Sequence, residues 1–279
     1  MKDILAIGDP GRAATHVGPG LPPHAAWPSD ISVSEYASSH FIIRGASVRG
    51  VLHRHLGSPR QDSYAIARGH DDDLVAAVVC DGVGSLQQSH VAADIVATVT
   101  LENYLEGRTW QESIGQANDV LRRHIAHESM ATTVVAVSLA WRPDGIWVDA
   151  ACVGDSELQH LHESGWRRIL PPSEATSPQP PEIATGRTKA LPTADLRVAE
   201  WSGMIDGGPV FLMTDGVGLP LKMSSMVRQK LAEWWAAAPR GLDFAEQVGF
   251  AKSTFVDDRT VVGFWHRVPP GKEDAETVR

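Results

Sequence analysis

Five aspartates of this sequence stand where an apolar or β-rich run ends, and each has a glycine, a serine or another polar residue beside it. They are Asp62, Asp81, Asp155, Asp215 and Asp258. Two of them open the same tetrapeptide, since "DGVG" occurs in "AVVCDGVG" and again in "FLMTDGVG". Asp-Gly is a common turn dipeptide, so a plain turn is the alternative for either copy alone. The repetition favours a functional role.

Carboxylates that converge at one rim of a fold would repel one another and resist ionising unless cations neutralise them. Oxygen ligands without histidine or cysteine favour hard ions such as Mg²⁺ or Mn²⁺. Gly82, next to Asp81, lets the backbone turn and exposes its carbonyl to a ligand. The pattern therefore predicts a hard-cation site.

Composition and charge limit the classes of function. The chain has 279 residues, 43% of them hydrophobic and 21% charged, with a formal charge of −9. This acidic balance argues against nucleic acid as a partner. The sequence has no apolar run of the roughly 20 residues that a membrane span needs, and its first residues do not resemble a signal peptide. Cys80 and Cys152 fall in apolar runs as core residues. We expect a cytoplasmic protein without a membrane partner.

The pattern of apolar residues predicts strands, two helices, strands, two helices and a final strand. This order indicates an α+β fold in one domain over residues 31–268, with an irregular extension over 1–30 and a polar tail over 269–279. Thr109 and Glu112 form a capping-box pattern, and "RPDG" indicates a hairpin. The predicted elements are strands at His40–Gly50, Ser63–Arg68, Leu74–Cys80, Thr132–Trp141 and Ile146–Asp155, helices at Leu86–Glu106, Thr109–His127, Met223–Ala238 and Leu242–Thr254, a hairpin turning at Ser164–Gly165, and a long loop over 171–195.

Six short blocks in a fixed order resemble the metal-dependent type 2C protein serine/threonine phosphatases, the PPM family. They are "GSPRQDSY", "VVCDGVGS", "MATTVVAV", "CVGDSELQHL", "FLMTDGVG" and "DDRTVV", and together they cover most of residues 45–265. The form "GVLHRHLGSPRQDSY" is similar to a bacterial branch of the family. The resemblance implies an αββα four-layer sandwich in which two mostly antiparallel sheets are flanked by helix pairs.

The resemblance also implies a role for each aspartate, transferred motif by motif. Asp81 would bridge two metal ions, and the carbonyl of Gly82 would complete one of them. Asp215 and Asp258 would hold the other ion. Asp62 would act on metal-bound water or lie just behind the metal ligands. Asp155 and Asp215 together would form the site of a third ion.

The activity implied is hydrolysis of phosphoserine and phosphothreonine on proteins by water activated between two ions, Mg²⁺ or Mn²⁺. The partner would be a protein phosphorylated by a cognate serine/threonine kinase. Two alternatives are a pseudophosphatase that serves as a binding or signalling module, and a phosphomonoesterase acting on small molecules. The metal aspartates are all retained, which favours an active enzyme.

The sequence departs from the family pattern at the phosphate-binding arginine. The position five residues before Asp62 is Gly57. Arg60 and His53 are the nearby substitutes, and His53 is also a candidate proton donor to the phosphate or the leaving oxygen. A histidine packed at a strand end is the alternative for His53. In the last block Arg259 follows Asp258, where the family usually has asparagine.

Overall fold

The computed structural model describes residues 5–12, 28–69, 73–172 and 189–267. The predicted polar tail over 269–279 lies outside these ranges, as do most of the predicted loop over 171–195 and residues 13–27 of the predicted extension.

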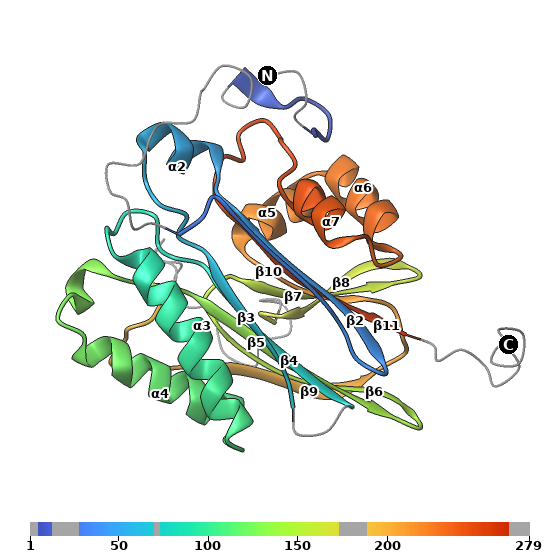
Figure 1. Ribbon diagram of the computed structural model, residues 1–279, viewed down its shortest axis with the longest axis horizontal. Coiled ribbons are helices and arrows are strands. Elements are labelled where there is room, and N and C mark those ends of the chain that lie inside the picture. The colour runs from blue at the N-terminus through green and yellow to red at the C-terminus, as the bar shows by residue number, and fades with distance from the viewer. Residues whose placement is uncertain (1–4, 13–27, 70–72, 173–188, 268–279) are drawn as a thin grey trace, which may run out of the picture.

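The two sheets pack face to face (Figure 1), and every pairing between their strands is antiparallel. The first sheet has the order β1-β2-β11-β10-β7-β8 and the second has the order β3-β4-β5-β6-β9. The strands of the first sheet are β1 Ile31–Ala37, β2 Phe41–Val48, β11 Arg259–His266, β10 Val210–Met213, β7 Glu157–His162 and β8 Gly165–Leu170. Those of the second are β3 Ser63–Arg68, β4 Leu74–Cys80, β5 Val134–Arg142, β6 Gly145–Val153 and β9 Ala199–Ile205.

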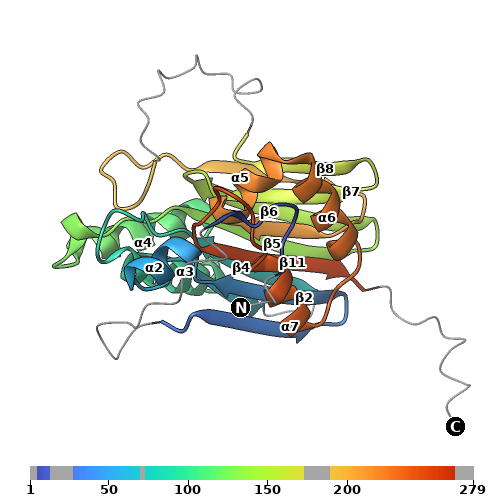
Figure 2. The same ribbon diagram turned by 90° about the horizontal axis from the view of Figure 1, so that it is seen from above.

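Helices cover the outer face of both sheets, which confirms the predicted αββα sandwich (Figure 1). The second sheet is covered by α3 Ser89–Leu105 and α4 Trp110–Arg123, and the first by α5 Asp215–Met223, α6 Ser225–Trp235 and α7 Gly241–Val248. Figure 2 shows α5 and α6 toward the β8 edge and α7 toward the β1–β2 edge. No helix in the described ranges is long and apolar enough to cross a membrane.

Strand β4 explains why one run of the sequence is apolar without interruption. Val75, Ala77 and Val79 face the core between the sheets, because alternate residues of a strand share a face. Ala76, Val78 and Cys80, on the opposite face, pack against α3 and α4. Both faces of β4 are therefore buried, as the sequence predicted.

The capping box at the start of α4 is present as predicted. The Thr109 hydroxyl accepts from the Glu112 N–H at 3.2 Å, and the Glu112 carboxylate accepts from the Thr109 N–H at 2.9 Å. These two contacts satisfy N–H groups that a helix start leaves without a partner.

Several elements differ from the prediction. Strands β1 and β9 were not predicted; both are edge strands whose residues alternate between partial and full exposure. Helix α5 was missed because Gly216, Gly218 and Pro220 lower helix propensity over its short length. Helix α2, Val51–Leu56, is a further short helix that ends at Gly57 in the left-handed conformation.

Residues 5–12 contact the folded domain, although the sequence predicted only an irregular extension there. Ile7 is 3% exposed and belongs to the core under α5–α7. Its N–H donates to the Ala251 carbonyl at 3.1 Å, and the Ala251 N–H donates to the Leu5 carbonyl at 2.8 Å. The Ser253 N–H donates to the Asp9 carbonyl at 2.9 Å. This part of the chain is therefore attached to the segment that leads into β11.

Candidate metal centre

Asp81 follows the last residue of β4, and its backbone is fixed by the neighbouring strand. The carbonyl of Asp81 accepts from the Thr132 hydroxyl and from the Thr133 N–H, each at 2.8 Å. The Val83 N–H donates to the Ala131 carbonyl at 2.9 Å. A side chain at Gly82 would lie 2.7 Å from the Gln61 carbonyl. Glycine is thus required where the turn passes close to its neighbour.

Thr132 also fixes the chain that precedes β9. Its backbone exchanges two hydrogen bonds with Leu191, at 2.9 Å and 2.8 Å. The Asn118 side chain exchanges two more with the backbone of Thr193, at 2.8 Å and 3.0 Å. Residues 189–195 are therefore anchored beside the turn that carries Asp81.

Asp215 is the first residue of α5, directly after the buried strand β10. Gly216 follows it, and a side chain there would overlap the Asp258 carbonyl. The second "DGVG" therefore starts a helix, whereas the first forms a turn. In both copies another part of the backbone lies against the glycine that follows the aspartate, at Gln61 in the first copy and at Asp258 in the second.

Asp81 and Asp215 lie close enough for their carboxyl groups to share a hydrogen bond. Burial, and after it the charges of Asp62, Asp215 and Asp257, raise the pKa of Asp81 well above its usual range. Burial raises the pKa of Asp215 to about 6, and the charges of Asp257 and Asp155 add to this increase. The cluster holds more negative charge than it can carry without a proton or a cation.

The adjacent aspartates Asp257 and Asp258 differ in their surroundings. The Oδ1 atom of Asp258 accepts from the Gly50 N–H and its Oδ2 atom accepts from the Gln61 N–H, both at 2.6 Å. Asp258 is 2% exposed, whereas the preceding residue, Asp257, is exposed. Although Asp257 as a whole is exposed, neighbouring protein partly desolvates its carboxyl group, and this desolvation together with the charge of Asp258 raises its pKa. Both oxygens of Asp258 are thus occupied by backbone donors, and the carboxylate of Asp257 acts on Asp81 and Asp215.

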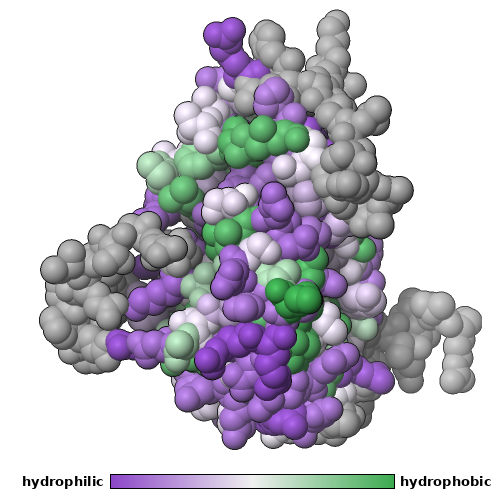
Figure 3. Space-filling view, turned by 90° about the vertical axis from the view of Figure 1, so that its left-hand side faces the viewer, coloured by the Kyte–Doolittle hydropathy of each residue, from purple (hydrophilic) through white to green (hydrophobic). Residues whose placement is uncertain are grey.

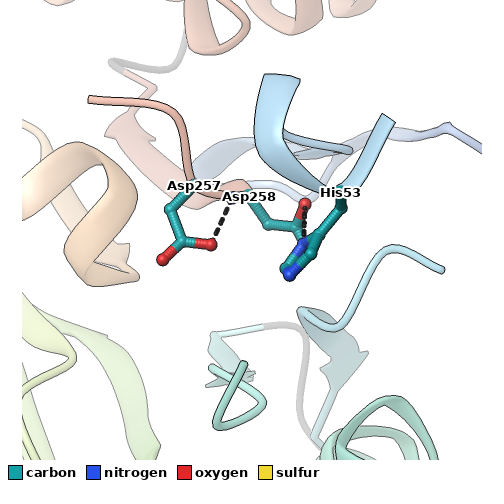
Figure 4. Close-up of side chains that lie close together, drawn as sticks. All are labelled: His53, Asp257 and Asp258. Atoms are coloured by element: carbon teal, nitrogen blue, oxygen red, sulfur yellow. Dashed lines mark hydrogen bonds and ion pairs between the residues drawn. The ribbon is translucent and has the colours of Figure 1, made fainter. Parts of the chain in front are cut away.

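His53 lies on α2 and points toward these two aspartates (Figure 4). Its Nδ1 atom is 2.9 Å from Oδ1 of Asp258, in a direction poorly aligned for a hydrogen bond. Burial lowers the pKa of His53, but the contact with Asp258 and the charges of Asp258 and Asp257 outweigh burial and raise it overall. One ligand atom from each of these three side chains lies within 4.8 Å of the others.

The other ring nitrogen of His53 faces the first "DGVG" turn. A side chain at Gly84 would lie 3.8 Å from Nε2 of His53 and 3.6 Å from Oε1 of Gln61. Oε1 of Gln61 is buried without a hydrogen-bond partner among the described residues. Glycine therefore leaves space beside Asp81 that an imidazole and an amide both face.

Asp62 is buried behind the turn. Its Oδ2 atom accepts from the hydroxyls of Thr214 and Thr260, at 2.9 Å and 2.8 Å. Burial, and then the charge of Asp258, raise its pKa well above the usual range. These contacts connect Asp62 to Thr214, the residue before Asp215, and to Thr260 in β11, the strand that follows Asp257 and Asp258.

Two arginines near the cluster are buried. Arg60 is 8% exposed and donates to the Ser47 carbonyl at 3.1 Å, and burial lowers its pKa. Arg259 donates to the Phe255 carbonyl at 2.7 Å, and its guanidinium carbon lies 4.7 Å from the centre of the Phe250 ring. Burial lowers the pKa of Arg259 to about 10. Both cations lie inside the protein, beneath the acidic cluster.

The structure thus brings Asp81 and Asp215 together from the list of predicted residues, and the charge of Asp155 reaches Asp215. It places Asp62, Asp258 and Arg60 in buried supporting positions. Asp257 and Gln61 were not predicted as site residues. Each is next to a predicted aspartate in the sequence, but the sequence does not show which of two adjacent side chains faces the site.

The face that carries the cluster is chemically mixed. Figure 3 views the molecule from the side on which α2, α3 and α4 lie in Figure 1. Hydrophobic patches there lie between hydrophilic ones. Leu52 and Leu56 of α2 are 42% and 62% exposed. A ligand at this end of the sandwich would therefore meet both apolar and polar side chains.

Comparison with known proteins identifies the family of this arrangement. The sequence model of the family described as protein phosphatase 2C matches residues 49–243. No curated protein sequence matches the chain significantly.

Solved structures with the same fold include three proteins of low sequence identity to this chain. RsbX in complex with magnesium is 14% identical, with a TM-score of 0.54, over 85% of this chain and 100% of that one. A serine/threonine phosphatase of S. agalactiae is 16% identical, with a TM-score of 0.58 and coverage of 85% and 100%. The catalytic domain of the serine threonine protein phosphatase PstP, in complex with two manganese ions, is 16% identical, with a TM-score of 0.55 and coverage of 82% and 99%.

Proposed function

This chain belongs to the protein phosphatase 2C family, and we propose from this that it removes phosphate from phosphoserine and phosphothreonine on proteins with the help of two divalent metal ions. The observation that carries the proposal is the close group of Asp81, Asp215 and Asp257. The charges of Asp215 and Asp257 raise the pKa of Asp81, and the charge of Asp257 raises the pKa of Asp215. Such a group is unfavourable by itself and becomes favourable around cations.

The donors present fit Mg²⁺ or Mn²⁺. The side chains are carboxylates, and the Gly82 carbonyl lies in a turn whose backbone is fixed by Thr132 and Thr133. When bound, the ions would supply a nucleophilic water at neutral pH and neutralise charge on the phosphoryl oxygens. Asp81 would bridge them, and Asp215 and Asp257 would hold the second ion. Asp155, whose charge acts on Asp215, would help to hold a third.

Asp257 replaces Asp258 in this scheme. Asp258 was predicted from the sequence as a ligand, but its two oxygens accept backbone N–H groups at 2.6 Å. A carboxylate already bonded in this way is a positioning group. We assign it the task of holding His53 and the two chain segments, at Gly50 and Gln61, that border the turn of Asp81.

His53 is the better candidate for contact with the substrate. Its Nε2 atom faces the space over Gly84, and the nearby carboxylates raise its pKa. A protonated imidazole there can donate to a phosphoryl oxygen or give a proton to the departing serine or threonine oxygen. Arg60, the other candidate, donates to the Ser47 carbonyl and lies within the protein.

Asp62 has a supporting role. Its hydrogen bonds to Thr214 and Thr260 lie behind Asp215 and Asp257, so it orients the strands that carry these residues. Its negative charge also raises the pKa of Asp81. Asp62 would therefore strengthen cation binding by the cluster through its charge, without contacting the substrate.

The substrate would be a phosphoprotein modified by a cognate serine/threonine kinase. The mixed face around the site (Figure 3) suits a peptide with apolar and polar residues. A cytoplasmic location is part of the same proposal. The predicted metal residues are retained, which favours an active enzyme over a pseudophosphatase.

The test is hydrolysis of a phosphothreonine peptide and of p-nitrophenyl phosphate with Mn²⁺, with Mg²⁺ or with chelator. We expect turnover with either ion and its loss in chelator, with recovery when the ion is restored. Full turnover in chelator would contradict the metal requirement. Hydrolysis of p-nitrophenyl phosphate without any peptide turnover would point to a small-molecule substrate.

A further inference from the structure

A pocket of about 270 Å³ lies between the edge strand β8 and helices α5 and α6, a region visible in Figure 2. Trp166 and Leu221 form its apolar walls. The indole N–H of Trp166 donates to the Arg228 carbonyl at 2.9 Å, and its ring packs against Phe211 at 5.3 Å between centroids. The wall is thus fixed in place from two sides.

Three cationic side chains line this pocket: Arg168 on β8, Lys222 on α5 and Arg228 on α6. Arg228 donates to the Lys222 carbonyl at 3.2 Å, which fixes its direction. Arg168 lies 3.4 Å from Oε1 of Glu157, long for a hydrogen bond. A guanidinium has five N–H donors, so Arg168 keeps donors for a ligand.

One carboxylate, Glu157, lies at the base of the pocket. It is 7% exposed, and its Oε2 atom accepts from the Gln159 amide at 2.6 Å. Three cations against one such carboxylate leave the lining with an excess of two positive charges. The chain as a whole has a formal charge of −9. A positive pocket on an acidic protein is a specific place for an anion.

Two of the elements that line the pocket also lead to the candidate metal centre. Glu157 is two residues after Asp155 at the start of β7. Lys222 is in the helix that starts at Asp215. Lys222 lies seven helical residues after Asp215, a span of roughly 10 Å. A peptide substrate in extended conformation would cover this distance with about three residues.

We propose that this pocket binds an anionic group of the phosphoprotein substrate, a carboxylate or a second phosphate, about three residues from the phosphoserine or phosphothreonine that is hydrolysed. The inference rests on the proposed function, because it places the hydrolysed residue at the aspartate cluster. Guanidinium and ammonium groups bind either oxyanion with charge-assisted hydrogen bonds. The apolar walls remove water from the anion and strengthen these contacts.

Binding can be measured apart from turnover. Labelled peptides would carry a non-hydrolysable phosphonate in place of phosphothreonine, with alanine, aspartate or a second non-hydrolysable phosphonate three positions away on either side. Fluorescence anisotropy with the full chain and Mn²⁺ gives each Kd. We expect aspartate or the second phosphonate on one side to bind about tenfold more tightly than alanine, the size of one or two charge-assisted contacts.

Charge reversal identifies the residues responsible. The double variant Lys222→Glu with Arg228→Glu should abolish the preference for the acidic peptides. Lys230→Glu is the matched control, since Lys230 is a cation of α6 outside the pocket lining and its variant should keep the preference. Equal affinities for all the peptides, or a preference that survives the double reversal, would overturn the proposal. Competition by free inorganic phosphate with no peptide preference would also overturn it.

Turnover of the matching phosphothreonine peptides separates the two proposals. A preference in binding without hydrolysis would retain the anion pocket and reject the phosphatase function. Hydrolysis at one rate, with one Kd for all the peptides, would retain the function and reject the pocket.

Discussion

The Nδ1 atom of His53 lies 2.9 Å from the Oδ1 atom of Asp258. The same oxygen accepts the Gly50 N–H at the start of α2, so one carboxylate holds the helix and also lies against the imidazole that the helix carries. With Nδ1 beside Asp258, Nε2 faces the space over Gly84. The pair is arranged as a carboxylate that orients a proton donor.

Replacing His53 with alanine should lower kcat/KM for a phosphothreonine peptide by roughly ten- to a thousand-fold, the range for losing a proton donor or a charged contact. The basic limb of the pH–rate profile, where His53 loses its proton, should also disappear. His55→Ala is the control, because His55 is exposed on the same helix. The Mn²⁺ requirement should stay close to that of the original chain. An unchanged kcat/KM with a lower Tm would mark His53 as a packing residue.

Asparagine at Asp257 and at Asp258 should have different effects. Asp257→Asn removes a proposed ligand, so the Mn²⁺ concentration for half-maximal activity should rise by about 100-fold or more, with the Tm in chelator unchanged or raised. Asp258→Asn sets an amide N–H₂ against a backbone N–H donor, which costs about 1–3 kcal/mol, and should lower the Tm in chelator. Titrations of activity and Tm against Mn²⁺ distinguish the two. The reverse pattern would restore Asp258 as the ligand.

Without a bound cation, stability should fall as the pH rises through about 6. Asp215 has a pKa raised from 3.8 to about 6 in the folded protein, so the folded state binds a proton that the unfolded state releases. The resulting stabilisation is complete below about pH 4 and is lost as the pH passes the folded value. Asp215→Asn should remove this loss, worth roughly 1–3 kcal/mol, and should abolish nearly all turnover while the fold remains. Tm in chelator from pH 5 to pH 8 measures the effect. A kcat close to that of the unchanged chain would show that the assignment of Asp215 as a metal-binding residue is wrong. Asp81→Asn should also abolish nearly all turnover, and a near-normal kcat would reject the assignment of Asp81 in the same way.

Substituting Ile7 with aspartate should lower the Tm, because it places a charge in the core under α5–α7. The loss should be about 3 kcal/mol or more. Ile125→Asp is a matched control, since Ile125 is 98% exposed, and should change the Tm little. Equal Tm values for the two variants would show that Ile7 does not contribute to the core, as the irregular extension predicted over residues 1–30 implies.

The layers of the fold were predictable because strands buried on both faces have an unmistakable pattern. The run from Leu74 to Cys80 is apolar throughout, and both of its faces meet a core in the structure. The capping box at Thr109 was equally clear, since it depends on residues three positions apart. Edge strand β9 was missed because one of its faces is exposed, so it has no uninterrupted apolar run, and because Gly203 interrupts its short polar–apolar alternation.

The aspartates of the site were predictable as a set, but their individual environments were not. Asp257 and Asp258 are adjacent and identical in type, so only the path of the backbone decides which one turns inward. That path depends on Gly50 and Gln61, about 200 positions away. The docking of Ile7 on Ala251 was hidden because the apolar run Ile4–Ile7 is only four residues long and is followed by glycine and proline, which is too short to show a periodicity.

The anchoring of Leu191 and Thr193 has a consequence for how members of this family can diversify. Leu170 and Leu191 are both buried, so the chain is fixed to the framework at two points. Leu191 is bonded to Thr132, the residue that also holds the carbonyl of Asp81. Because each point is held by its own contacts, insertions or deletions in the sequence between them should leave the aspartate cluster in place. In this scaffold the length of that connection can therefore vary independently of the site.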